Sequence, residues 1–147
     1  MSLAVKKMPR SVAELAEVYL QAWSDHDLEG ILALHTPDTA FWVHGGDGVM
    51  TWDGIDGCRV AFDYLLRLFP DQRFENKSLI VTDDYYIGHT IVTGTLALPW
   101  ELGNRVYQPN GKSITFEIQD FMHCQGNRIR IKEGWIDGLA IHNQLTQ

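Results

Sequence analysis

The sequence predicts an α+β fold, with helices covering one face of a curved, mostly antiparallel sheet. Before Pro70, apolar residues recur at helical spacing in three segments. After Pro70 the chain alternates apolar and polar residues, and short polar turns separate the alternating segments, as in strands joined by hairpins. Helices followed by a run of antiparallel strands are typical of the α+β class.

The first two helices have clear start and stop signals. Ser11 and Glu14 form a capping-box pattern, and apolar residues then recur at helical spacing as far as Trp23. Asp27 is placed to cap a short second helix, which Pro37 ends because proline cannot continue the hydrogen-bond ladder. These signals predict two adjacent helices at the start of the fold.

A third helix and the strands follow in order. The third helix is expected to begin at residue 56 or 57 and to stop at Pro70. The polar connection at 101–112 is expected to be a long loop or flap. The predicted strands span residues 41–44, 74–81, 86–98, 113–124 and 128–136, and a last short helix spans residues 139–145.

Composition narrows the class of protein. The 147 residues contain no repeat and no linker, so a single domain is expected over 1–147, with 1–10 as a loose tail. The formal net charge of −7 disfavours nucleic acids and anionic membranes as partners. The sequence has no apolar run of membrane-spanning length and no signal-peptide pattern, which favours the cytoplasm. No phosphate loop, dinucleotide motif or metal-ligand spacing is present, so we expect no cofactor and no metal.

Asp120 is the main candidate for chemistry. Strand alternation places it on the same face as Phe116, Ile118 and Met122. A carboxyl group on a buried face is costly unless it is paired or neutral. Three interpretations remain open: a functional acid in a pocket, a strand bulge that turns Asp120 to water, and a structural bond to a backbone amide.

Four further residues are weaker candidates. Tyr19 lies on the apolar stripe of the first helix. Two interpretations are open for it: a hydrogen-bond partner for Asp120, or a tyrosine of the core. His44 ends a predicted strand and precedes two glycines. It is interpreted either as a base at the mouth of a pocket or as an exposed loop histidine. Glu133 shares a strand parity with Ile129, Ile131, Trp135 and Asp137, which is expected to face inward, whereas Arg128, Arg130 and Lys132 share the outward parity. Asp137, just past the strand, is also placed to cap the last helix.

The order of several short stretches resembles that of the SnoaL-like polyketide cyclases, within the nuclear transport factor 2-like and ketosteroid isomerase-like superfamily. The similarity covers nearly the whole chain. Each matching stretch is weak evidence alone, and the order in which the stretches follow one another carries the resemblance. The matching stretches are YLQAW at 19–23, DLEG at 27–30, GIDGCR at 54–59, LFPD at 68–71, TGT at 93–95, PNGK at 109–112, and WID at 135–137 with QL at 144–145.

The resemblance implies a cone-shaped α+β barrel, in which three N-terminal helices close a bent sheet over one apolar cavity. It also implies a homodimer through the outer face of the sheet. Asp120 would then point into the cavity. The expected cavity wall consists of Trp23, Phe41, Phe62, Phe116, Ile118, Met122 and Trp135.

The family's catalytic patterns match this chain only in part. The ketosteroid isomerases' oxyanion-hole tyrosine and aspartic acid fall on Tyr19 and Asp120, but their base falls on Val43, beside His44. The cyclases' aspartate falls on Gly134, and its assisting histidine falls on Asp120. The expected function is cofactor-independent proton transfer on a small, largely apolar carbonyl compound. The alternative is a non-catalytic module of the same fold that binds a small ligand or a protein.

Overall fold

A computed structural model describes residues 8–147 of the chain. Of the tail expected at 1–10, residues 1–7 lie outside the described residues, whereas Met8 packs against the core and Pro9 is buried. The helices of the described part are α1 (Val12–Ser24), α2 (Leu28–Ala33), α3 (Gly54–Leu68) and α4 (Gly138–Thr146). The strands are β1 (His35–His44), β2 (Val49–Asp53), β3 (Arg73–Val81), β4 (Tyr85–Thr95), β5 (Trp100–Leu102), β6 (Arg105–Tyr107), β7 (Ser113–Gln125) and β8 (Arg128–Ile136).

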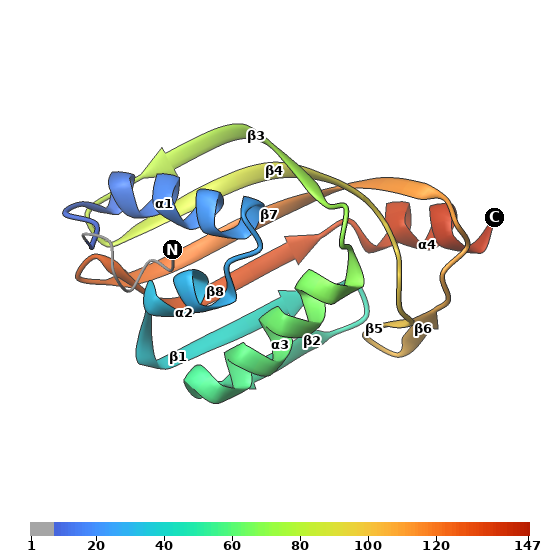
Figure 1. Cartoon of the computed structure of the whole chain (residues 1–147), viewed down its shortest axis with the longest axis horizontal. Helices are drawn as coiled ribbons and strands as arrows, with labels where there is room; N and C mark the ends of the chain where they lie inside the picture. Colours follow the sequence, from blue (N-terminus) through green and yellow to red (C-terminus); the bar gives the residue numbers. More distant parts are fainter. Residues whose placement is uncertain (1–7) are drawn as a thin grey trace.

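Six of the strands form one open, curved sheet in the order β2-β1-β8-β7-β4-β3, so the α+β class is confirmed. All its pairings are antiparallel except that of β1 with β8. Helices α1 and α3 pack over this sheet, and α4 follows β8 at the C-terminal end (Figure 1). The sheet and these two helices therefore enclose the interior in which a ligand site can form.

The helix caps follow the sequence signals. The hydroxyl of Ser11 accepts a hydrogen bond from the Glu14 amide at 3.1 Å, and Asp27 accepts one from the Gly30 amide at 3.0 Å. Asp137 caps α4 by accepting a hydrogen bond from the Ala140 amide at 3.0 Å, as one of its two interpretations predicts. Such caps satisfy amide groups that the first turn of a helix leaves free.

The structure differs from the sequence prediction in the connection at 101–112, in β2 and in the start of β1. The connection expected as a loop at 101–112 contains part of a short hairpin, β5 paired with β6. Strand β2 was not predicted, and β1 begins six residues before the expected start at Phe41. These strands are short or interrupted by polar residues, so their alternation is weak in the sequence.

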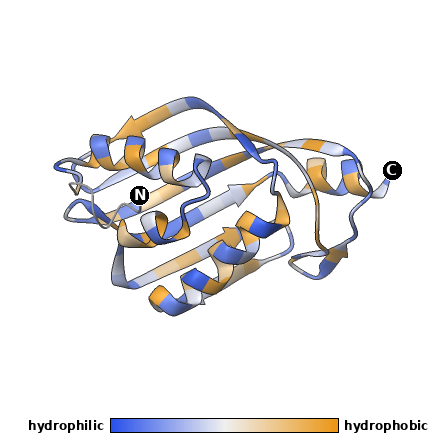
Figure 2. Ribbon diagram, viewed as in Figure 1, coloured by the Kyte–Doolittle hydropathy of each residue, from blue (hydrophilic) through white to orange (hydrophobic). Residues whose placement is uncertain are grey.

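The core consists of two packed clusters of buried side chains. One joins α1, α2 and α3 to β1 and contains Phe62, which is fully buried. The other lies under β5 and α4 around Trp100 and Ile141. Hydrophobic and hydrophilic residues alternate along the helices and strands (Figure 2). Each element can therefore turn a mainly hydrophobic side toward the interior. No helix within residues 8–147 has the length and apolar character needed to cross a bilayer.

Candidate active site

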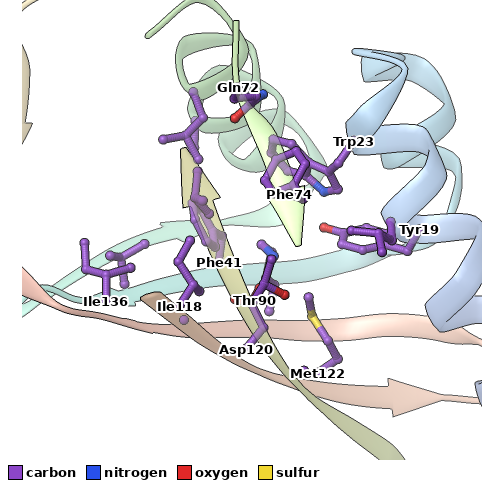
Figure 3. A pocket seen from close by; sticks show the side chains of 18 of the residues that line it. Tyr19, Trp23, Phe41, Gln72, Phe74, Thr90, Ile118, Asp120, Met122 and Ile136 are labelled. Atoms are coloured by element: carbon purple, nitrogen blue, oxygen red, sulfur yellow. The ribbon is translucent and has the colours of Figure 1, made fainter. Parts of the chain in front are cut away.

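A cavity of about 240 Å³ lies between the helices and the concave face of the sheet. Helices α1 and α3 form one side of it, and strands β1, β4, β7 and β8 form much of the other. Most of its lining is aliphatic or aromatic, and Figure 3 shows Phe41, Phe74, Ile118 and Met122 around the space. The cavity has the size and character of a site for a small, largely apolar molecule.

Asp120 lines this cavity from the middle of β7, on the face that strand alternation predicts. Its neighbours across the sheet are glycines on both sides, Gly88 of β4 and Gly134 of β8. A β-carbon at Gly134 would lie 3.0 Å from the Asp120 carboxylate, whereas one at Gly88 would meet nothing within 4 Å. The carboxylate thus leans over Gly134, and the space above Gly88 is open cavity.

Lys132 is the charged partner of Asp120. Its ammonium Nζ lies 3.3 Å from Asp120 Oδ2, and the side chains of Lys132 and Asp120 are only 10% and 20% exposed. The same ammonium lies over the rings of Tyr19, Trp23 and Phe41, at 5.2, 5.6 and 6.0 Å from their centroids. Ring faces attract a cation, so the aromatic side chains help to offset the cost of burying this charge.

The inward position of Lys132 corrects the prediction for β8. The register of β7 with β8 shifts where His123 pairs with Ile131 but Cys124 pairs with Ile129, which leaves Arg130 as an extra residue. Such a bulge reverses the facing of every residue beyond it. Lys132, Gly134 and Ile136 therefore line the cavity. The inward facing expected for Glu133 and Trp135 is wrong, and so is the outward facing expected for Lys132.

The hydroxyl of Tyr19 is held by a buried histidine. It lies 3.0 Å from His35 Nε2, and His35 Nδ1 lies 2.9 Å from the hydroxyl of Thr39. Burial, with the nearby charge of Lys132, lowers the pKa of His35 from 6.5 to about 3, so this imidazole is neutral. Burial raises the pKa of Tyr19 by more than a hydrogen bond with Trp23 lowers it, and the nearby charge of Asp120 raises it further, so Tyr19 is a phenol. Tyr19 and Asp120 both line the cavity, but Tyr19 bonds to His35 and Asp120 pairs with Lys132.

One buried hydrogen-bond donor in the cavity wall, Nε2 of Gln72, has no acceptor within residues 8–147. The indole N–H of Trp23, whose side chain belongs to the buried core, faces the hydroxyl of Tyr19 as a hydrogen-bond donor. In Figure 3 the indole nitrogen of Trp23 and the hydroxyl of Tyr19 lie at the cavity ends of their side chains, and Gln72 lies across the cavity from Asp120. Buried donors are normally paired, so the Gln72 amide is an exception among the described residues.

Three of the predicted site residues form a separate cluster on the outer face of the sheet. His44 Nε2 lies 2.7 Å from one carboxylate oxygen of Glu133, and His123 Nε2 lies 3.2 Å from the other. Burial raises the pKa of Glu133, but the hydrogen bonds from both histidines outweigh it and lower the pKa overall. The ring of Trp135 stacks on His44 with centroids 3.7 Å apart. None of these four side chains lines the cavity.

The expected cavity wall is correct in most of its members. Trp23, Phe41, Phe116, Ile118 and Met122 line the cavity. Two members of the expected wall do not line it. Phe62 packs behind the wall, with ring centroids 5.3 Å from Trp23 and 5.1 Å from Phe41, and Trp135 lies on the outer face.

Lys132, His35 and Gln72 are the site residues that sequence reasoning missed. A bulge has no signature in a single sequence, so nothing marked Lys132 as inward. His35 was passed over because its strand was not predicted to begin there. Within the described part of the chain, no group of three or more histidine, cysteine or acidic side chains is arranged to hold a metal ion.

The fold defines a class of small α+β proteins in which helices close over the concave face of a curved sheet. The sequence model of the SnoaL-like polyketide cyclases matches residues 13–145, and the chain belongs to this family. Among curated protein sequences, none matches it.

Solved structures show the same fold at low sequence identity. A nuclear transport factor 2-like protein from Burkholderia thailandensis is 20% identical, with a TM-score of 0.74 over 95% of this chain and 99% of that one. One of unknown function from Burkholderia pseudomallei is 18% identical, with a TM-score of 0.73 over 92% and 98%. TerC, crystallised with polyporic acid, is 17% identical, with a TM-score of 0.71 over 92% and 98%. These likenesses establish the fold alone.

Proposed function

We propose that this protein is a cofactor-independent enzyme that transfers a proton next to the carbonyl group of a small, largely apolar compound. The observation that carries the proposal is the Asp120–Lys132 pair, a carboxylate and an ammonium 3.3 Å apart in the wall of an otherwise apolar cavity. A positioned carboxylate is a suitable general base, and an apolar surrounding strengthens it because water does not solvate the charge.

Asp120 acts as the base in this proposal, rather than as a protonated oxyanion-hole donor. An adjacent ammonium stabilises the charged form of a carboxyl group. The carboxylate removes a proton from the carbon beside the carbonyl, and the electron pair of that bond moves to the carbonyl oxygen to give an enolate. Return of the proton to another carbon completes an isomerisation. Attack of the enolate carbon on a second carbonyl gives a cyclisation, and loss of a hydroxyl group gives a dehydration.

The location of the carboxylate supports the proposal. The resemblance places the cyclases' aspartate at Gly134, and the Asp120 carboxylate occupies the space beside Gly134 that a side chain there would enter. β7 thus supplies a carboxylate close to the position where the resemblance expects one from β8. The alternative, a non-catalytic binding module, would fit a collapsed cavity or an Asp120 held by backbone amides. The cavity is open, and among the described residues no backbone amide donates to Asp120.

Hydrogen exchange on β-tetralone, a small aromatic ketone, tests the proposal. The wild-type protein in D₂O should accelerate exchange of the hydrogens beside the carbonyl, followed by proton NMR. Asp120→Asn should slow this exchange by about 100-fold or more, the contribution expected of a general base. Glu117→Gln is the matched control, because Glu117 lies on the same strand but is exposed and pairs with His89. Equal rates in the Asp120→Asn variant and the control, or no acceleration by the wild type, would refute the proposal.

We further propose that the protein is a cytoplasmic homodimer joined through the outer face of the sheet. The resemblance implies this assembly. It is supported by Trp135, a large apolar side chain on the outer face that is 49% exposed and stacks on His44.

A further inference from the structure

We propose that Lys132 is a catalytic residue that forms an imine with the carbonyl group of the ligand, so that Asp120 removes a proton from the carbon beside an iminium group instead of a free carbonyl group. The inference rests on the proposed function, which places a small carbonyl compound in this cavity. It adds a covalent step to that function and names the residue that carries it out.

The first argument is the position of the Lys132 amine. Lys132 is 8% exposed, whereas Lys77 and Lys112, the other lysines within residues 8–147, are exposed. It is also the only lysine among the described residues that line the cavity. Imine formation needs a primary amine that the carbonyl group can reach, and lysine is the side chain that supplies one. A carbonyl compound bound in the cavity therefore meets this amine in the wall.

The second argument is the route by which the ammonium loses its proton. An amine attacks a carbonyl carbon only in its neutral form, and the Lys132 ammonium lies 3.3 Å from Asp120 Oδ2. Transfer of one proton from Nζ to Oδ2 converts two charges into two neutral groups without changing the total charge. Because burial disfavours charged groups, the apolar cavity lowers the cost of this transfer relative to water. Lys77 provides the contrast, since it pairs with Glu75 at 3.2 Å but the two side chains are 45% and 67% exposed.

The steps of imine formation balance with Lys132, Asp120 and the ligand alone. The neutral Lys132 amine adds to the carbonyl carbon, and the proton held by Asp120 passes to the carbonyl oxygen. Asp120 next takes a second proton from the nitrogen and gives it to the new hydroxyl group, which leaves as water. The product is an iminium that carries one positive charge and one N–H, and Asp120 is again a carboxylate. The carbonyl oxygen and two of the three ammonium protons have left as water.

The third argument is that the iminium suits both the rings and the base around it. Its positive charge remains on the nitrogen that lies over the rings of Tyr19, Trp23 and Phe41, so their attraction for a cation is kept. Asp120 then removes a proton from the carbon beside the C=N bond, and the electron pair of the C=N bond moves to nitrogen to give an enamine. The enamine and the protonated Asp120 are both neutral, whereas an enolate there would be a buried anion. After the proton returns to carbon, addition of water releases the product and restores Lys132.

Reductive trapping with sodium cyanoborohydride tests for the imine. This reductant converts an iminium into a stable secondary amine, so wild-type protein incubated with β-tetralone should gain the mass of one β-tetralone less one oxygen atom. Peptide mapping by mass spectrometry should place the adduct on Lys132, with at least about tenfold less on Lys77, because binding in the cavity positions the ketone beside one amine. Para-nitroanisole, an aromatic ether without a carbonyl group, should protect Lys132 by occupying the cavity and leave the labelling of Lys77 unchanged.

Lys132→Arg separates the imine from a purely electrostatic role. Arginine keeps a positive charge beside Asp120 but does not form an imine with a ketone. This variant should slow the hydrogen exchange of β-tetralone about as much as Asp120→Asn does. A lysine that acted only through its charge would tolerate this change, and exchange would then continue at the wild-type rate. Trapping and mapping use the wild-type protein, so they decide the question even where the variant does not fold.

The outcomes separate this inference from the proposed function. The inference is supported if the adduct forms on Lys132 of the wild type and para-nitroanisole blocks it. It is overturned if no adduct forms, if Lys77 is labelled as strongly as Lys132, or if the Lys132→Arg variant keeps the wild-type exchange rate. Exchange that persists without an adduct would overturn the imine and leave the base function of Asp120 standing. An adduct on Lys132 without accelerated exchange would leave the imine standing and refute the proposed function.

Discussion

Acidification should destabilise the protein through His35, because the folded protein excludes the proton that this residue binds in the unfolded chain. In the folded protein His35 is neutral, with a pKa of about 3 instead of its ordinary 6.5, because it is buried and lies near Lys132. Between these two values the unfolded chain binds a proton that the folded chain excludes, so the free energy of unfolding falls as the pH drops below 6.5. Above 6.5 both states are neutral and the effect disappears.

The expected loss follows from the size of this interval. Each pH unit below the unfolded pKa costs about 1.4 kcal/mol, so about 2 kcal/mol is lost at about pH 5. Because the folded pKa lies well below that pH, the loss at this point depends only on the unfolded value. The chain of contacts from Tyr19 through His35 to Thr39 is the structural element that weakens, because the ring partners of a charged His35 are two neutral hydroxyl groups and the Lys132 ammonium lies nearby.

The assay is urea denaturation of the wild type and of His35→Gln at about pH 7 and about pH 5. The variant removes the titrating group and keeps a polar side chain. Carboxylates and the other histidines titrate alike in both proteins and cancel in the comparison. Wild type should lose about 2 kcal/mol more than the variant over this interval. Equal losses would show that His35 is not buried neutral in the folded protein, and the argument for its pKa would fail.

Two further substitutions test the cavity and the assembly. Gly88→Leu places a side chain in open cavity space beside Asp120, at a strand position with nothing within 4 Å of the new β-carbon. It should abolish binding of para-nitroanisole, measured by calorimetry, without lowering the free energy of unfolding; undiminished binding would show that the probe lies elsewhere. Trp135→Ser should weaken the proposed dimer at least about tenfold in sedimentation equilibrium. Leu139→Ser is its control, 70% exposed on α4, and an unchanged dimer in both variants would exclude this face.

The fold class and the face of β7 could be predicted from the sequence. Helical and strand periodicities are local properties, and the capping residues Ser11, Asp27 and Asp137 act on amide groups within three residues of themselves. Asp120 was recognised because β7 is regular, so the alternation from Ile114 to Met122 runs without interruption. These features require no knowledge of how distant parts of the chain meet.

The chemical partners of Asp120 were decided only by the tertiary structure. Strict alternation on β8 predicts Glu133 inside and Lys132 outside, and one extra residue at Arg130 exchanges them. That bulge depends on how β8 pairs with β7 and with β1 at the same time, which no local pattern encodes. It turns the ammonium of Lys132 toward Asp120 and moves Glu133 to His44 on the outer face. Sequence alone determined that a carboxylate faces the interior; pairing between strands decided which charge meets it there.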